Sequence, residues 1–342
     1  MSRLRCRKRS FVVLSVLLAP LGSTLLVSCT NLAGPPPPLQ AAPATAPTLS
    51  SGPALPTRPV PAPVSSFTGL ATDLGAPTLC VKIDNSRQAR PQSGLEQADL
   101  VYVEPIEGGL SRLLAVYQSQ IPPVVGPVRS VRQSDLELLA NFGRPALGFS
   151  GEAAALRPLI DQSPVLDVSL RNRPGAYRRD GRRAMPHNLY ADAHQLSEGG
   201  APPQDIGFRF GPTPPGGQPV PDTAVRYGAT EIAVQWVPAE SRWVVAIDGA
   251  AFTSASGARL GATTVVLQRV VVRETQIRDA AGTPSPFVAT VGSGEAIVLR
   301  DGQAFGGQWS RPAPGLGTTF TLPDGTPLTF APGPVWIVLV PA

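Results

Sequence analysis

Histidine, cysteine and lysine are scarce in this chain of 342 residues, and their scarcity excludes several kinds of site. Two histidines, His187 and His194, are too few for a three-histidine metal centre, and neither an HExxH motif nor a paired-cysteine spacing is present. The sequence also lacks a P-loop, a dinucleotide-binding glycine fingerprint and a GxSxG nucleophile elbow. We therefore expect no metal site and no cofactor.

Acidic residues are absent from the first 28 positions, where five basic residues precede an apolar run from Phe11 to Val27. This is the pattern of a secretory signal peptide, and the residues just before Cys29 resemble a bacterial lipobox. We expect residues 1–28 to be removed and Cys29 to carry the lipid. The alternative is a plain transmembrane anchor, but the run is short for a span and is interrupted by a proline and a glycine.

Removal of the signal peptide changes the charge of the remaining chain. The five basic residues account for the whole net charge of +5, so the rest carries 24 basic and 24 acidic side chains. A neutral body of this kind gives no reason to expect nucleic acid as a partner. We expect an exported protein that the lipid on Cys29 holds to a membrane. The lipid would hold the protein on the outer side of the cytoplasmic membrane, or in the periplasm or outer membrane.

Proline-rich segments divide the rest of the chain. Residues 29–66 are predicted to be a linker, because a segment rich in Pro, Ala and Ser cannot build a core. Residues 67–200 alternate strand-like and helix-like segments, whereas residues 223–342 contain strand-like runs separated by Asp-Gly turns. A Pro/Gly-rich crossing at 201–222 separates them. The predicted fold class is α+β or α/β: a layered α/β N-terminal domain followed by a strand-rich C-terminal domain.

Apolar runs and helical periodicity locate the elements within these two domains. The predicted strands are 79–83, 99–103, 113–118, 146–149 and 165–169 in the first domain, and 231–237, 242–247, 263–273, 296–300, 318–322 and 335–340 in the second. Helices are predicted at 133–141, with Ser130 or Ser134 as the N-cap, and at 152–160, where Pro158 argues against a continuous helix.

Polar side chains follow several of the predicted strands. Because strand ends in an open α/β sheet can converge on one cleft, we expect a ligand site there. The residues of this predicted cleft are Asp84, Asn85, Arg90, Glu107, Arg112, Arg129, Ser130, Arg132, His187 and Asn188. The start of the helix at 133 would add free N–H groups that attract anions. The alternative is a set of internal ion pairs, in which Arg129 and Arg132 neutralise Asp84 and Glu107.

Six arginines lie within thirteen residues near the end of the first domain, opposed only by Asp180. They are Arg171, Arg173, Arg178, Arg179, Arg182 and Arg183. Clustered guanidinium groups suit carboxylate or phosphate ligands, because each is a planar fork of donors. The alternative is a solvated loop whose arginines pair with acidic residues elsewhere.

Two other residue types are predicted to belong to the core. Cys80 lies in an apolar run, where a buried and inert thiol is expected. All four tryptophans fall in the second domain, and they are expected to pack in a β-sheet rather than to form a glycan-binding surface. They are Trp236, Trp243, Trp309 and Trp336.

Longer motifs recur in order along the chain. They are VKIDN at 81–85, RPQSG at 90–94, ADLVY at 98–102, EGGLSR at 107–112, GPVRSVR at 126–132, MPHNLY at 185–190, GSG at 292–294, QWSR at 308–311 and PGPVWI at 332–337. Together they resemble the YerB-like bacterial lipoproteins, a family of two linked domains of unknown function. The resemblance covers residues 67–342 and implies an exported lipoprotein with an α/β N-terminal domain and a β-rich C-terminal domain. It implies no chemistry.

The function we expect is that of a cell-envelope binding or accessory protein. It would recognise an anionic or glycan ligand, such as a cell-wall polymer, in the N-terminal cleft. One alternative is a scaffold that binds another envelope protein through a sheet edge or an aromatic patch. A less favoured alternative is an envelope hydrolase or transferase that uses His187, the only catalytic candidate, as general acid or base. A binding protein is expected ahead of an enzyme.

Overall fold

Strands dominate the part of the chain that the computed structural model describes, which is residues 63–279 and 281–342. The predicted signal peptide, Cys29 and all but the last four residues of the predicted linker lie outside these described residues. Ser65 is already buried and its hydroxyl donates to Gln118 Oε1 at 3.3 Å, so ordered packing starts before residue 67. Everything described belongs to one compact unit, Pro59–Ala342, which contains its own sheets and core.

The first half of the described chain combines short helices with strands near the predicted positions. Its strands are β1 (Leu79–Asp84), β2 (Leu100–Pro105), β3 (Ser111–Tyr117), β4 (Ala146–Gly148), β5 (Leu166–Asp167), β6 (Tyr177–Arg179) and β7 (Leu189–Ala191). Its helices are α1 (Gln133–Leu139), α2 (Arg157–Gln162) and α3 (Ala193–Ser197). Pro158 lies in the first turn of α2, where its missing N–H costs nothing, and a 3-10 turn at Ala154–Leu156 precedes it.

The second half consists of strands joined by tight turns. They are β8 (Gln218–Pro219), β9 (Asp222–Tyr227), β10 (Thr230–Val237), β11 (Arg242–Ile247), β12 (Ala250–Ala251), β13 (Gly261–Ala262), β14 (Thr264–Val270), β15 (Val272–Arg278), β16 (Pro284–Val288), β17 (Gly292–Arg300), β18 (Gln303–Arg311), β19 (Thr319–Thr321) and β20 (Val335–Pro341). Asp301-Gly302 joins β17 to β18 with φ positive at both residues, as a two-residue hairpin turn requires.

The strand predicted at 263–273 is wrong as a single element. It divides at Val271, which is 61% exposed, into β14 and β15. β14 remains in the large sheet beside β20, whereas β15 leaves that sheet and pairs with β16 as a two-stranded ribbon. The division sends the ribbon toward α1, which β16 contacts.

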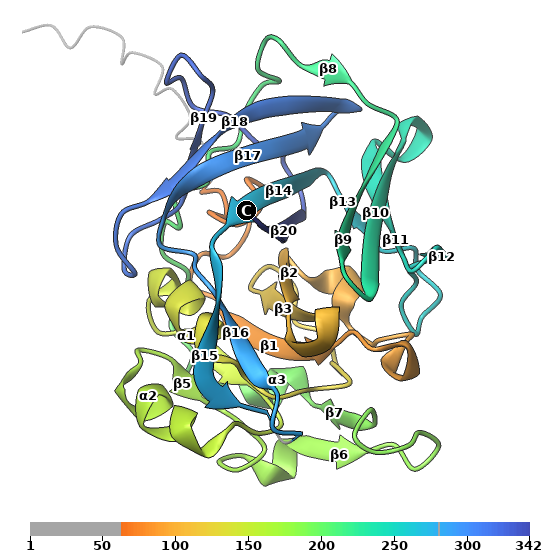
Figure 1. Cartoon of the computed structure of the whole chain (residues 1–342), viewed down its shortest axis with the longest axis vertical. Helices are drawn as coiled ribbons and strands as arrows, with labels where there is room; N and C mark the ends of the chain where they lie inside the picture. Colours follow the sequence, from red (N-terminus) through yellow and green to blue (C-terminus); the bar gives the residue numbers. More distant parts are fainter. Residues whose placement is uncertain (1–62, 280) are drawn as a thin grey trace, which may run out of the picture. The chain divides into compact units, whose positions relative to one another are not determined.

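Strands from both halves of the chain form one large sheet (Figure 1). Its order is β19-β18-β17-β14-β20-β2-β3-β1-β4-β5, with β8 paired to β18. The last strand of the chain, β20, runs parallel to both of its neighbours, so that Val335 lies opposite Thr264 on β14 and Leu100 on β2. β20 is almost wholly apolar and buried, as expected for a strand covered on both faces.

Side-chain alternation gives the large sheet a core on each face. On β1, Leu79, Val81 and Ile83 join a cluster that includes Trp243 of the separate five-stranded sheet, which has the order β12-β11-β10-β9 with β13 on β11. Cys80 faces the other side, among residues of α1 and β14. Burial of Trp243, Trp309 and Trp336 confirms the core prediction for these three tryptophans, and Trp236 is half-buried against Trp243.

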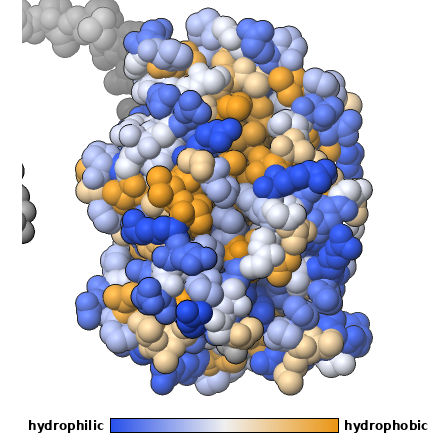
Figure 2. Space-filling view, viewed as in Figure 1, coloured by the Kyte–Doolittle hydropathy of each residue, from blue (hydrophilic) through white to orange (hydrophobic). Residues whose placement is uncertain are grey.

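On the face seen in Figure 2, apolar residues gather in patches with polar residues between them. No helix within residues 63–279 and 281–342 is long and apolar enough to span a membrane.

Candidate functional site

A column of charged side chains crosses an otherwise apolar face of the sheet. Asp84 on β1 lies opposite Arg112 on β3, and Glu104 on β2 lies opposite the same arginine. Cross-strand partners share a face, and side chains two residues apart on a strand share it too, so Lys82 also belongs to this column. The four charges therefore lie on the α1 side of the sheet.

One end of the column is sealed. The Lys82 ammonium donates to Glu104 and, at 2.6 Å, to Asp135 Oδ1 of α1. None of the three side chains is more than 2% exposed. Burial and the neighbouring charge of Asp135 raise the pKa of Glu104 to about 8, so a proton on Glu104 leaves one cation facing one anion. This end is a structural ion cluster.

The sealed cluster supports the segment that carries the predicted site arginines. The Asp135 Oδ2 atom accepts from the backbone N–H of Arg132 at 2.6 Å, and the Lys82 carbonyl accepts from the N–H of Arg129 at 2.8 Å. The expectation that free N–H groups at the start of α1 attract an anion is therefore wrong at Arg132, the residue that caps the helix. That group is already bonded to a carboxylate, and α1 has only seven residues.

The other end of the column opens into a pocket of about 380 Å³. Four arginines line it, together with two carboxylates and small side chains. The lining residues are Arg112, Arg129, Ser130, Arg132, Glu152, Ala153, Ala154, Leu156, Arg278, Asp279 and Ser285. The pocket is thus predominantly cationic.

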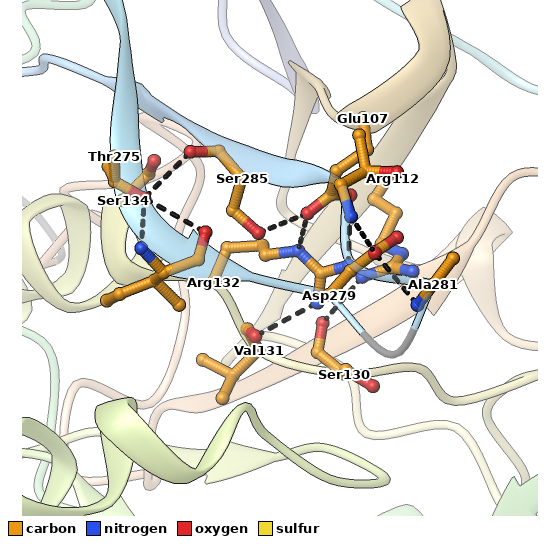
Figure 3. A network of polar contacts seen from close by, with 12 residues as sticks. Glu107, Arg112, Ser130, Val131, Arg132, Ser134, Thr275, Asp279, Ala281 and Ser285 are labelled. Carbon is orange, nitrogen blue, oxygen red and sulfur yellow. Dashed lines mark hydrogen bonds and ion pairs between the residues drawn. The ribbon is translucent and has the colours of Figure 1, made fainter.

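Arg132 is held at the side of this pocket by a bidentate ion pair with Glu107 (Figure 3). Its Nε and Nη2 atoms donate to the two carboxylate oxygens of Glu107 at 2.8 and 3.0 Å, and Ser285 Oγ donates to the same carboxylate. Burial opposes the charge of Glu107, but the bonds from Arg132 and Ser285 outweigh it and lower the pKa. Glu107 is consequently an ionised partner that fixes Arg132.

Arg112 has no such partner within the described residues. It is 6% exposed, and its one hydrogen bond goes from Nη1 to the carbonyl of Ser130 at 3.2 Å. No carboxylate in the described part of the chain lies within 4 Å of its guanidinium nitrogens. Burial and the positive charges of Arg132 and Arg129 lower its pKa to about 10, partly offset by Glu107 and Asp84. Arg112 is a buried cation with spare donors at a pocket.

Asp84 holds the third arginine and the histidine. Its Oδ2 atom lies 3.2 Å from Arg129 Nε and 2.7 Å from His187 Nδ1. Ser86 Oγ lies 2.9 Å from the same Nδ1 atom, and the N–H of Ser86 donates to Asp84 Oδ1 at 3.0 Å. A carboxylate on Nδ1 orients an imidazole and leaves Nε2 for other partners.

The structure brings together only part of the predicted cleft. Arg112, Arg129, Ser130 and Arg132 line the pocket, with Glu107, Asp84 and His187 behind or beside the arginines. The predicted ion pairs of Arg129 with Asp84 and of Arg132 with Glu107 are both present. A pocket and internal ion pairs therefore coexist.

Three predicted residues have their contacts elsewhere. Asn85 Nδ2 donates to Ser111 Oγ at 2.8 Å, and Arg90 bridges the Asn85 carbonyl and Asp248. Asn188 accepts from Arg179 and donates to carbonyls of its own loop. Asn85 and Arg90 thus tie the end of β1 to other segments, Asn188 holds its own loop, and none of the three lines the pocket.

Sequence reasoning missed two groups of residues at this site. Lys82 could have been found, because it stands two residues from Asp84 on the same apolar strand. Glu104 could have been found, because it is an ionisable residue near the end of an apolar strand. Arg278, Asp279 and Ser285 could not, because Arg278 and Ser285 lie on the ribbon β15–β16 of the other half and Asp279 directly follows β15. That ribbon is held against α1 by the bond from the N–H of Val288 to Ser134 Oγ at 2.9 Å.

No cluster of three or more His, Cys, Asp or Glu side chains suited to a metal ion occurs among the described residues.

Cys80 is fully buried, and burial raises the pKa of its thiol, which confirms the prediction of a buried thiol.

Comparison with known proteins supports the resemblance drawn from the motifs. Residues 67–205 match the N-terminal domain, and residues 223–337 the C-terminal domain, of a family described as "Protein of unknown function (DUF3048)". The chain is 47% identical over 64 residues to the "Putative lipoprotein YerB" of Bacillus subtilis (strain 168), a match that covers 19% of each protein. The fold is similar to the crystal structure of the YerB protein from Bacillus subtilis, with a TM-score of 0.68 and 23% identity. That likeness covers 82% of this chain and 97% of the other.

Proposed function

This chain belongs to the two-domain DUF3048 family of YerB-like proteins, and we propose that it is a lipid-anchored binding protein whose pocket beside Arg112 takes a small anionic ligand. The observation that carries the proposal is the environment of Arg112. A guanidinium that is nine-tenths buried, unpaired with any carboxylate in the described chain and flanked by two further arginines is costly without a counter-charge. A bound anion supplies that charge.

The arrangement favours a ligand with a carboxylate or phosphate group. A guanidinium presents its donors in a fork that matches two oxygens of such a group, and Arg112 has donors to spare. Arg129 and Arg132 add charge while Asp84 and Glu107 hold them in place. The volume of about 380 Å³ suits one acid group with a small body, such as a fragment of a cell-wall polymer.

Anchoring by lipid is the second part of the proposal. The sequence before Cys29 resembles a lipobox, and the Bacillus subtilis relative carries the name of a putative lipoprotein. The lipid would place the pocket on the outer side of a membrane. Membrane fractionation of cells that express the full chain tests this: Cys29→Ala should move the protein out of the membrane fraction. An unchanged distribution contradicts lipidation at Cys29.

Calorimetry on residues 59–342 tests the pocket, with inorganic phosphate, acetate and peptidoglycan fragments as titrants. Arg112→Gln should weaken binding of the best titrant at least about tenfold, the equivalent of one charged hydrogen bond. Arg226→Gln is the matched control, because Arg226 is exposed and lies outside the pocket. Equal affinities for Arg112→Gln and the unchanged protein, with intact circular dichroism, would refute the proposal.

One observation favours a second candidate function, hydrolysis or group transfer. The 2.7 Å contact between Asp84 and His187 Nδ1 is the arrangement that prepares an imidazole to act as a general base through Nε2. Arg129, on the same carboxylate, would stabilise developing negative charge. The test is turnover of 4-nitrophenyl acetate and 4-nitrophenyl phosphate, with His187→Gln as the variant. Activity that survives His187→Gln contradicts this assignment, whatever the anion-binding result.

A further inference from the structure

A second cationic hollow lies beside β6 and the loop that joins β6 to β7. Its volume is about 610 Å³, and it shares no lining residue with the pocket beside Arg112. The lining residues are Pro91, Ser93, Val124, Arg178, Arg179, Asp180, Gly181, Arg182, Arg183, Tyr190 and Ala255. Four of the six clustered arginines therefore meet around one concave surface.

Bonds to the body of the protein hold this loop in shape. Arg183 donates to the carbonyls of Ala89 and Pro91 at 2.8 and 2.9 Å, which fastens the loop to the segment after β1. Within the loop, the Asp180 N–H donates to the Asn188 carbonyl at 2.8 Å, and Asn188 Nδ2 donates back to the carbonyl of Asp180. The arginines are thus presented from a fixed backbone, so that less conformational entropy is lost when they bind.

A bond also fixes the part of the hollow that the second half of the chain contributes. Ala255, from the turn between β12 and β13, donates its N–H to the Gln92 carbonyl at 2.7 Å. Tyr190 on β7, which is 7% exposed, also lines the hollow. Both halves of the chain therefore shape the hollow.

The charges around the hollow do not cancel. Asp180 is the only carboxylate that lines it, and Arg182 already holds both of its oxygens at 2.9 and 3.0 Å. Arg179 donates only to the neutral amide of Asn188. Arg178 makes no hydrogen bond or ion pair with any described residue. Four guanidinium groups against one carboxylate leave about three positive charges unmatched.

We propose that this hollow, formed by Arg178, Arg179, Arg182 and Arg183, binds a chain of linked phosphate groups. Two or more phosphates in series would distribute their charge over several guanidinium forks, whereas one carboxylate would match only one. The concave shape favours a soluble or polymer-borne phosphate chain over the flat surface of a bilayer.

Calorimetry with sodium tripolyphosphate on residues 59–342 tests this assignment. Arg178→Gln/Arg182→Gln should raise the Kd for tripolyphosphate at least about tenfold, because it removes two of the four guanidinium groups. Neither arginine fastens the loop to the body of the protein, so the hollow should keep its shape. Arg209→Gln/Arg226→Gln is the control, since it removes the same charge from exposed positions outside both pockets. Arg112→Gln should leave this Kd within about twofold, which separates the two pockets. Circular dichroism checks the fold of each variant, and Arg178→Gln alone replaces the double variant if that one is unfolded.

Two results would overturn the assignment. Equal losses in the test and control variants would show that only net charge matters. If the protein co-sediments with phosphatidylglycerol vesicles but shows no saturable binding of tripolyphosphate, the arginines would be assigned to a membrane surface instead.

Discussion

The two ends of the charged column on β1, β2 and β3 differ in how their charges are compensated. At the sealed end, Lys82 meets Glu104 and Asp135, and all three side chains are excluded from water. At the open end, Arg112 meets a carbonyl and two other cations beside a pocket. Burial is similar at both ends, so burial does not distinguish a structural charge from a functional one. The presence or absence of an oppositely charged side chain within ion-pair distance makes that distinction.

The largest expected effect comes from removing the cation of the sealed end. Lys82→Met leaves Asp135 without its charged partner in a dry core, which should lower the free energy of unfolding by about 3–5 kcal/mol. Urea denaturation of residues 59–342 measures this. The triple variant Lys82→Met/Glu104→Gln/Asp135→Asn, in which no charge remains, should recover part of the loss. A loss below about 1 kcal/mol in Lys82→Met would contradict the comparison.

A pH effect of at most similar size is expected from Glu104. Its pKa is about 8 in the folded protein and near 4.5 when unfolded, so the folded state holds a proton that the unfolded state releases. This stabilisation is complete below about pH 4.5 and is lost as the pH rises toward 8, with a slope of up to about 1.4 kcal/mol per pH unit. Glu104→Gln should flatten that decline. Urea denaturation at pH 5, 6.5 and 8 compares the two proteins, and parallel curves would show that Glu104 is not the titrating group.

A smaller change in stability is expected at the open end. Arg112→Met removes a cation that lacks a carboxylate partner, so the free energy of unfolding should change by about 1 kcal/mol or less. Thermal unfolding with and without inorganic phosphate sharpens the contrast: phosphate should raise the Tm of the unchanged protein more than that of Arg112→Met. A loss as large as that of Lys82→Met would make Arg112 structural.

The smallest effect is expected from a thiol reagent. Cys80 lies two residues from Lys82 on β1, is fully buried, and is the only cysteine in residues 59–342. Folded protein should not react with 5,5′-dithiobis(2-nitrobenzoate) within an hour, whereas protein in urea should release one equivalent of thiolate. Rapid reaction of the folded protein would show that the sealed end is open to solvent.

Local pattern was sufficient to predict most elements of the fold. The largely apolar runs at 79–83 and 335–340 became β1 and β20, because short runs rich in Val, Ile and Leu favour strands that are covered on both faces. The strand predicted at 263–273 was wrong as one element. β14 pairs with β20 only as far as Val270 and Pro341, and the apolar pattern of 263–273 contains no information about where a neighbouring strand ends. Which strands pair, and over what length, depends on the whole sheet and cannot be read from one segment of sequence.

The candidate site shows the same division. Polar residues at strand ends identified Arg112, Arg129, Ser130 and Arg132 as candidates, and these four do line a pocket. The same reasoning included Asn188, which instead stabilises the loop between β6 and β7. It gave the pairing of Arg129 and Arg132 with Asp84 and Glu107 only as an alternative to a cleft, and it could not show that Arg112 lacks a carboxylate partner within the described residues.

The sequence by itself determined the alternation of strands, the family motifs, the neutral charge after the N-terminal segment, and the density of arginines. These properties depend on near neighbours and composition. Only the tertiary structure decided that β20 joins both halves in one sheet and that β15 and β16 complete the pocket. It also decided which arginines have partners, because ion pairing depends on distances between residues far apart in the chain, such as the 2.8 Å between Arg132 and Glu107.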